Sequence, residues 1–428
     1  MANHTWRGDA LVVNQVDTIV PSGTWVTGDE ITLTINGRAL IVTVGSAVGN
    51  TDIANIINAA WNASDSTTGL LGSESRNFGG DEIPEFSEIT SSVAVETVSL
   101  TGDDQKPFTL AVAENSSAGS LTHSASATAA KGPNHLIAEN FDSGSLPSAG
   151  DTVYIQSGST SILYGLSALA SVAVDNVFIF AGYTGFIGLP RVNLDNAADY
   201  IEYRQRYLRC PVNVEVRVGS GSGSSSGRIQ LDFVAATTKL IVFGTGSSVE
   251  PDRYALQIKG GDLVAGEAYI FSGEVDFAPD GADTAAFDQT TVSGSATLRC
   301  SAGCSFDKLN VEGSSTVSTD SNVADAKVRD TATWHKGSGA VTAVDVQGGT
   351  LSLMGTGTVT TLNLGSATVD ASGLLEAVTI TSTNIRASGF TGSDPQAKLT
   401  TTNPIATSSV SIASGSFDPG PGRTVDIT

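Results

Sequence analysis

The sequence Leu309-Asn310-Val311-Glu312-Gly313 is the first of five copies of one short unit, all of which lie between residues 291 and 388. The later copies are Ala326-Lys327-Val328-Arg329-Asp330, Val344-Asp345-Val346-Gln347-Gly348, Leu362-Asn363-Leu364-Gly365-Ser366 and Val378-Thr379-Ile380-Thr381-Ser382. Each copy is apolar, polar, apolar and then turn-forming. The copies begin at residues 309, 326, 344, 362 and 378, so successive steps are 17, 18, 18 and 16 residues.

The alternation inside each copy has a period of two residues, which is typical of a β-strand. A second short alternation follows each copy, at Thr316-Val317, Ala332-Thr333-Trp334, Leu351-Ser352-Leu353, Ala367-Thr368-Val369 and Ile385. A repeat of this length cannot bury its own apolar face, so it has to stack on its neighbours. The pattern therefore predicts two short strands in each coil of a parallel β-solenoid, or β-helix.

Stacked coils place equivalent residues of successive copies in columns. We expect two interior columns, Leu309, Ala326, Val344, Leu362 and Val378, and Val311, Val328, Val346, Leu364 and Ile380. The residues between them should face outward, namely Asn310, Lys327, Asp345, Asn363 and Thr379. The alternative is a series of antiparallel hairpins in a sandwich. The even spacing favours the solenoid.

The chain of 428 residues is strongly acidic. It holds 22 Lys and Arg against 44 Asp and Glu, a formal net charge of -22. Such a charge repels DNA, RNA and anionic membranes, so we expect neither nucleic acid nor membrane as a partner. No apolar run approaches the roughly 20 residues of a transmembrane helix. The N-terminus lacks the apolar core of a secretion signal, which predicts synthesis in a cytoplasm.

Residues 1–115 predict a small α+β or β-sandwich-like domain. Asn36-Gly37 is a strong hairpin signal between two alternating strands, because both residues tolerate positive φ. The spacing predicts one helix over 51–62, whose apolar stripe consists of Ile53, Ile56, Ile57, Ala60 and Trp61. We expect this helix to pack on the sheet and to be part of an anchoring domain.

The rest of the chain divides by composition. Residues 116–131 are small and polar, as in a linker or a plain edge strand. Residues 132–290 are β-rich with wider spacing and predict early solenoid coils, whereas 291–390 hold the regular short repeat. Residues 391–428 are richer in proline, which stops strand pairing, and so predict a C-terminal cap or arm.

One local cluster of basic and aromatic residues stands out in this acidic chain. It consists of Tyr200, Tyr203, Arg204, Arg206, Tyr207 and Arg209. Such residues suit a patch that binds an acidic partner or a sugar. The other interpretation, which we favour, is that they are ordinary strand residues with exposed charges.

The sequence lacks the short motifs that mark phosphate-binding and metalloprotease sites. The chain has no Gly-x-x-x-x-Gly-Lys-[Ser/Thr] phosphate loop and no His-Glu-x-x-His. Cys210, Cys300 and Cys304 are too few for a disulfide framework and predict free thiols. We therefore predict a non-enzymatic protein without catalytic residues, cofactor or metal site.

Residues 140–155 read Asn-aromatic-x-x-Gly-x-x-Pro-x-x-Gly-Asp-Thr-Val-x-Ile. This run resembles the entry segment of β-solenoids in bacterial surface proteins and phage structural proteins, where it closes the first coil. In addition, the stretches 28–37, 59–62 and 85–90 are similar to a small domain that recurs in accessory structural proteins of tailed phages.

That resemblance implies an N-terminal module anchored to the particle and a solenoid that projects outward. The implied function is capsid decoration, as a cement or head-fibre protein, with a tail fibre or tailspike as the alternative. The resemblance also implies a homotrimer, a major capsid protein or other virion protein as partner, and a place on the virion.

A polysaccharide depolymerase or glycan-binding solenoid is the competing interpretation, because fold alone does not give function. It needs a groove with clustered acids, an Arg or Lys and aromatic platforms, for which residues 200–209 are the only candidate in the sequence. A third possibility, a bacterial surface adhesin, conflicts with the missing secretion signal.

Overall fold

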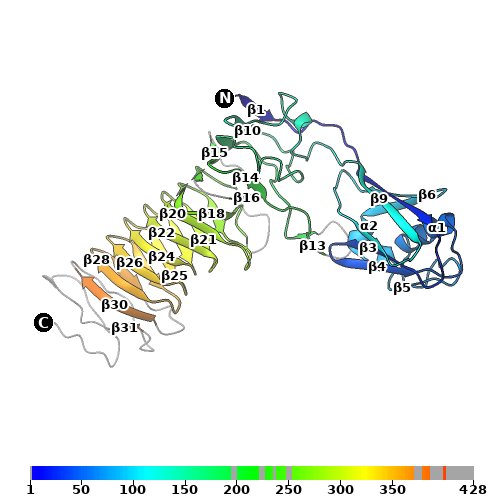
Figure 1. Cartoon of the computed structure of the whole chain (residues 1–428). Coiled ribbons are helices and arrows are strands. Elements are labelled where there is room, and N and C mark those ends of the chain that lie inside the picture. The colour runs from blue at the N-terminus through cyan, green and yellow to red at the C-terminus, as the bar shows by residue number, and fades with distance from the viewer. Residues whose placement is uncertain are drawn as a thin grey trace.

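The computed structural model describes residues 2–193, 200–220, 227–234, 238–246, 253–370, 378–385 and 399–401. The fold is mainly β, and its largest part is a sheet of 21 strands that pair in parallel. Figure 1 shows these strands wound into a long stack of coils, with a second unit set at an angle to it. The parallel pairing is consistent with a solenoid-like fold and excludes the antiparallel hairpins considered for the repeats.

We call the parallel strands the coil stack. They are β1 (Asn3–Trp6), β10 (Thr152–Ile155), β11 (Asn176–Phe180), β14 (Leu208–Cys210), β15 (Glu215–Ser220), β16 (Ile229–Phe233), β17 (Lys239–Val242), β18 (Leu256–Ile270), β19 (Glu274–Phe277), β20 (Ala285–Val292), β21 (Thr297–Cys300), β22 (Cys304–Val311), β23 (Thr316–Thr319), β24 (Asn322–Val328), β25 (Thr333–Lys336), β26 (Val341–Val346), β27 (Thr350–Leu353), β28 (Val359–Leu364), β29 (Thr368–Asp370), β30 (Val378–Ile385) and β31 (Leu399–Thr401).

The interior columns predicted from the first four copies are confirmed. Leu309, Ala326, Val344 and Leu362 are in register and buried, as are Val311, Val328, Val346 and Leu364. The same columns extend back through the wider coils to Val153 and Ile155 of β10. A continuous apolar core therefore runs along the described coil stack.

The predicted register of the fifth copy is wrong. Leu362 and Leu364 pair with Thr383 and Ile385, not with Val378 and Ile380. Ile380 instead pairs with Val359 and joins a third interior column with Val323 and Val341, so it is still buried. Ile380 and Ile385 both fit the alternating pattern of residues 378–385. Alternation alone therefore does not show which of the two pairs with Leu364.

The second strand of each coil also follows the prediction for four copies. Val317, Trp334, Leu351 and Val369 pair in sequence and are buried. Ile385, expected in this position for the fifth copy, belongs to β30 and pairs with Leu364. The outward column of Asn310, Lys327, Asp345 and Asn363 is in register as expected, whereas Thr379 lies outside it.

Residues 13–131 contain two sheets and an apolar core distinct from that of the coil stack, and we call them the N-terminal unit. Its strands form two antiparallel four-stranded sheets, in the orders β6-β7-β2-β9 and β5-β4-β3-β8. Its elements are β2 (Val16–Gly23), β3 (Glu30–Ile35), β4 (Arg38–Thr43), α1 (Asn50–Trp61), β5 (Ser75–Arg76), η1 (Gly80–Glu82), α2 (Pro84–Ser87), β6 (Ile89–Ala94), β7 (Thr97–Gly102), β8 (Ala111–Glu114) and β9 (Gly119–Thr128).

Local sequence signals in this unit are matched by the structure. Asn36 and Gly37 have φ of 50° and 73°, as the predicted hairpin between β3 and β4 requires. The predicted helix over 51–62 is α1, and its apolar stripe is buried in a core of its own. Trp61 packs on Phe86 with ring centroids 4.9 Å apart and donates its indole N–H to Ile89.

The N-terminal unit is inserted into the coil stack, which differs from the expected boundaries of 1–115 and 116–131. Residues 3–6 form β1 and pair with β10, so the chain enters the coil stack before it builds the unit. The segment 116–131, expected as a linker or a plain edge strand, contains β9, an edge strand paired with β2. Val13 and Lys131 exchange two backbone hydrogen bonds of 2.9 Å and close the insertion.

The outer edge of β1 is covered. Trp6 bridges Phe141, the backbone N–H of Arg7 donates to Asn140, and that of Asp142 donates to Thr5. The covering residues Asn140 and Asp142 come from the end of η2 (Ala138–Asn140) and from the start of the run 140–155, which was expected to close the first coil. A covered edge removes a template for unwanted strand pairing. The predicted C-terminal cap or arm, 391–428, lies outside the described residues apart from β31.

Candidate functional site

The six residues of the predicted basic-aromatic patch lie where the N-terminal unit meets the coil stack. The structure uses Arg204 to join the two. Its Nη2 lies 2.6 Å from Glu88 of the N-terminal unit, and its Nε donates to the carbonyl of Pro107 at 2.6 Å. Glu202 accepts from the same guanidinium at 3.2 Å. We call Glu88, Glu202 and Arg204 the junction triad.

The junction triad is almost completely buried, with 7% or less of each side chain exposed. Burial lowers the pKa of Arg204, but Tyr203, Glu202 and Glu88 outweigh this and raise the pKa above its usual value. Arg204 is therefore charged, and its charge is matched by two carboxylates. Charge-assisted hydrogen bonds from separate guanidinium nitrogens to two carboxylates fix the orientation of Arg204 as well as its distance from them.

Aromatic residues of the patch complete the junction. The Tyr203 ring packs against the core of the N-terminal unit and lies 4.7 Å from the Arg204 guanidinium. Tyr200, in β13 (Tyr200–Ile201), pairs with β12 (Val192–Asn193), and its hydroxyl accepts from Asn193 at 2.7 Å. Burial raises the pKa of Tyr200. These tyrosines are packing residues, because little of them faces solvent.

The other three patch residues face the coil stack. Arg206 donates to Asp280 at 2.8 Å, and Arg209 lies 3.9 Å from Asp232. Tyr207 is buried with its hydroxyl 3.4 Å from Asp283. The six predicted residues are thus neighbours, but most of their polar groups contact this chain and do not form a free surface.

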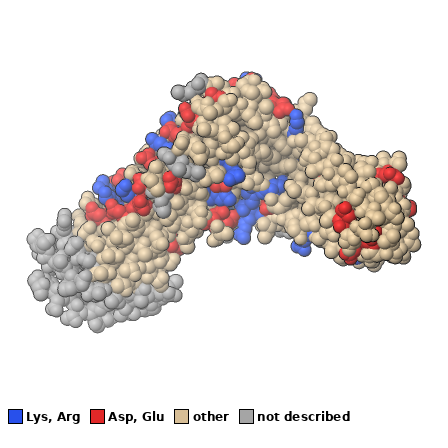
Figure 2. Space-filling view, in the orientation of Figure 1, with Lys and Arg blue, Asp and Glu red and all other residues tan. Residues whose placement is uncertain are grey.

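Three arginines lie close to the carboxylate of Asp280. Arg253 lies 2.6 Å, Arg206 2.8 Å and Arg191 3.8 Å from its carboxylate. Burial raises the pKa of Asp280, but the hydrogen bond from Arg206 and the three positive charges hold it below its usual value. Figure 2 shows basic side chains gathered on the inner side of the bend between the N-terminal unit and the coil stack. A cavity of about 220 Å³ lies beside them, lined by Tyr203, Arg204, Gln205, Arg206, Tyr207, Lys259 and Asp283.

Sequence reasoning missed the acids that complete the junction. Glu88 is 116 residues from Arg204, and Asp280 is 74 residues from Arg206. Nothing in the local sequence around either acid distinguishes it from an ordinary surface carboxylate. The alternation of charge and aromatic residues over 200–209 was the available signal, and it located one half of the contact.

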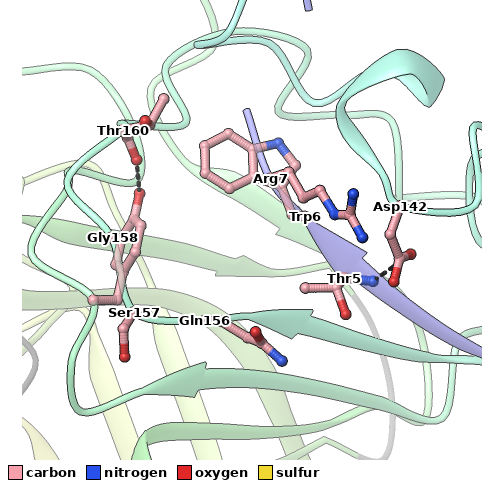
Figure 3. A pocket seen from close by; sticks show the side chains of 9 residues that line it. Thr5, Trp6, Arg7, Asp142, Gln156, Ser157, Gly158 and Thr160 are labelled. Carbon is pink, nitrogen blue, oxygen red and sulfur yellow. Dashed lines mark hydrogen bonds between the residues drawn. The ribbon is translucent and has the colours of Figure 1, made fainter. Parts of the chain in front are cut away.

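A second cavity, of about 320 Å³, lies beside β1 at the covered end of the coil stack. Figure 3 shows Asp142 on one side of it and the loop at 156–160 on the other, with Trp6 and Arg7 between them. Its lining residues are Thr5, Trp6, Arg7, Asp142, Gln156, Ser157, Gly158, Thr160 and Tyr183. The walls thus offer hydroxyl, amide, guanidinium and carboxylate groups next to an indole ring.

The groups around this second cavity are partly fixed. Asp142 accepts from the Thr5 backbone N–H at 3.0 Å, and Tyr183 donates to the Thr160 carbonyl at 2.9 Å. The hydrogen bond from Thr5, with the charge of Arg7, lowers the pKa of Asp142. Asp142 is the single acid among the lining residues, so the cavity does not contain the pair of carboxylates that glycosidic hydrolysis uses.

In the part of the chain that the structure describes, no three His, Cys, Asp or Glu side chains gather as metal ligands would. Cys210, Cys300 and Cys304 are free and buried. The described helices include none of the length and apolarity needed to cross a membrane.

Comparisons with protein-family models, with curated proteins and with solved structures gave no match to this chain.

Proposed function

We propose that this protein is a non-enzymatic structural component of a tailed-phage particle, in which the N-terminal unit attaches to the particle and the coil stack projects from it. Capsid decoration, as a cement or head-fibre protein, is the preferred form of the proposal. A homotrimer bound to the major capsid protein or another virion protein remains part of it, on the resemblance described above.

The junction triad is the observation that carries this proposal. A projecting rod transmits its orientation to its base only when the two parts are fixed to one another. Arg204 supplies that connection through buried bonds to Glu88 and Pro107. The apolar core that runs along the coil stack supports the same role, because each coil rests on its neighbours.

Attachment is tested by removing the N-terminal unit while keeping the coil stack, whose strands pair with one another. Val13 and Lys131 are hydrogen-bonded neighbours, so residues 13–131 can be replaced by a short Gly-Ser linker. We expect full-length protein on purified particles in a fixed ratio to the capsid protein, and the shortened protein in the unbound fraction. Electron microscopy and mass spectrometry of the particles provide the measurement.

The matched control is the substitution Arg204→Met in the full-length chain, which keeps the N-terminal unit but loosens the junction. We expect this variant to remain on particles with its rod variably oriented. Attachment of the shortened protein at the full-length ratio would contradict the anchoring role. Absence of the full-length protein from particles would contradict the proposal as a whole.

Glycan binding is the second candidate, and the cavity beside β1 favours it. Arg7 and Gln156 make no side-chain hydrogen bond or ion pair with other described residues, and both are exposed. Planar polar groups next to an indole are suited to saccharide hydroxyls. Binding of host surface polysaccharide, measured by calorimetry, should be lost in Arg7→Ala/Gln156→Ala and kept in Lys131→Ala. Equal binding by both variants would exclude this cavity.

A further inference from the structure

The outward face of the coil stack changes character along its length. In the first coils one outward column consists of Tyr154, Phe178, Arg217, Ile241 and Tyr269, paired in register. The same column continues as Thr291, Asn310, Lys327, Asp345 and Asn363. Large apolar side chains thus occupy four of the first five positions and none of the next five.

A neighbouring outward column repeats this change. Phe243 and Phe271 each follow a buried strand residue and are 44% and 42% exposed. Their rings stack with centroids 5.8 Å apart and 22° between the planes. The backbone N–H groups of Phe243 and Phe271 donate to the last interior residue of the preceding coil. In later coils the residues that make this same hydrogen bond are Ser293, Glu312, Arg329 and Gln347.

We call the resulting surface the aromatic face. It consists of Tyr154, Phe178, Phe180, Ile241, Phe243, Tyr269 and Phe271. Its rings contact one another across coils. For example, the centroid of the Tyr154 ring lies 5.4 Å from that of Phe178 and 6.1 Å from that of Phe180. Two groups of outward aromatic rings thus lie on the same side of neighbouring coils, with Arg217 between them. Outward apolar side chains gathered in this way are typical of an interface.

The charges on these strands limit what can cover the aromatic face. The outward charged residues of β10, β11, β15, β17 and the end of β18 are Glu215, Arg217, Lys239 and Glu267, two of each sign. Arg217 and Lys239 lie over aromatic rings, 4.9 Å from Phe178 and 5.7 Å from Tyr269. This face therefore has no net charge, whereas the whole chain carries -22.

Two molecules as acidic as this one repel each other wherever their charged surfaces meet. A basic partner would be drawn to the acidic surfaces elsewhere on the chain. A neutral aromatic surface is where a second copy meets the least repulsion, and it supplies matching apolar area and salt-bridge partners of both signs. We propose that copies of this chain associate side by side through the aromatic face, so that Phe243 and Phe271 become buried between neighbouring copies.

This inference rests on the self-association in the proposed function and names the surface responsible for it. The test is sedimentation equilibrium of the full chain and of Phe243→Ser/Phe271→Ser. We expect the parent to self-associate and the variant to have a dissociation constant at least about tenfold higher, equivalent to about 1.4 kcal/mol. Both side chains point outward, so circular dichroism should be unchanged.

The matched control is Glu312→Ser/Arg329→Ser, which alters the same outward column in later coils and should leave the association unchanged. A second variant, Phe271→Arg, keeps a long side chain but brings like charges together and should also dissociate the copies. If the parent associates and neither aromatic-face variant weakens it, the assigned surface is wrong while self-association stands. A monomeric parent would overturn both, whatever is found on phage particles.

Discussion

Arg204 Nη2 lies 2.6 Å from Glu88 Oε2, and this contact joins the N-terminal unit to the coil stack. Replacing Arg204 by Met would leave Glu202 buried without its counter-charge, and Glu88 with only Lys106, whose Nζ lies 3.4 Å away. Breaking a buried pair in this way costs about 3–5 kcal/mol. We expect the free energy of unfolding, measured with urea, to fall by about that amount, and small-angle scattering to show a wider range of shapes.

An exposed pair is the control for this prediction. Lys131 lies 2.6 Å from Glu139, but about half of each side chain is exposed. Solvent screens such pairs, so Lys131→Met should cost less than about 1 kcal/mol. Equal losses in the two variants would mean that the junction triad does not hold the two units together.

Val346→Asp tests the interior column. Val346 is fully buried and pairs with Val328 and Leu364 in the neighbouring coils. An unpaired carboxylate at this position costs several kcal/mol, so we expect a large drop in the melting temperature. The control is Asp345→Ala, one residue earlier on the outward side, which should melt like the parent. A stable Val346→Asp would mean that the side chain is not confined to the core.

The repeat was predictable because every coil has to meet the same physical requirement. Each coil needs an apolar residue at the same place, and the even spacing from Leu309 to Leu362 reveals the register. The fifth copy was misplaced because Ile380 and Ile385 both satisfy the local alternation. Only the hydrogen bonds to the preceding coil show which of the two continues the column. Those hydrogen bonds depend on the number of residues that separate one strand from the next.

The junction was only half predictable for a different reason. Arg204 belongs to a recognisable local cluster, whereas Glu88 follows a short helix in another part of the chain. A contact across 116 residues depends on how the N-terminal unit is inserted between β1 and β10. That insertion has no local signal, because β1 is only four residues long.

Lys336 should make stability depend on pH. It is buried and donates to the carbonyls of Gly337 and Gly357 at 3.0 and 2.7 Å. Burial lowers its pKa from 10.5 to about 8, although Asp320 opposes this. Between these two values the unfolded chain binds more protons than the folded one, so stability contributed by this group rises with pH.

The measurement for Lys336 compares the parent with Lys336→Met by urea unfolding at several pH values. We expect the difference in free energy of unfolding to move in favour of the parent as the pH rises from about 8 to about 10.5. Below pH 8 both states of the parent keep the proton, so the difference should be constant there. A difference that falls with pH over the upper range would contradict the assigned direction.

Gly339 tests how closely successive coils approach. A Cβ placed on Gly339 would run into the backbone carbonyl of Ser321 in the preceding coil, and backbone cannot move aside as a flexible side chain does. Overpacking of this kind costs about 1–3 kcal/mol, so Gly339→Ala should lower the urea midpoint. Gly281→Ala is the matched control, because a Cβ there meets nothing within 4 Å. If both variants unfold at the parent's midpoint, the coils near Ser321 are further apart than described.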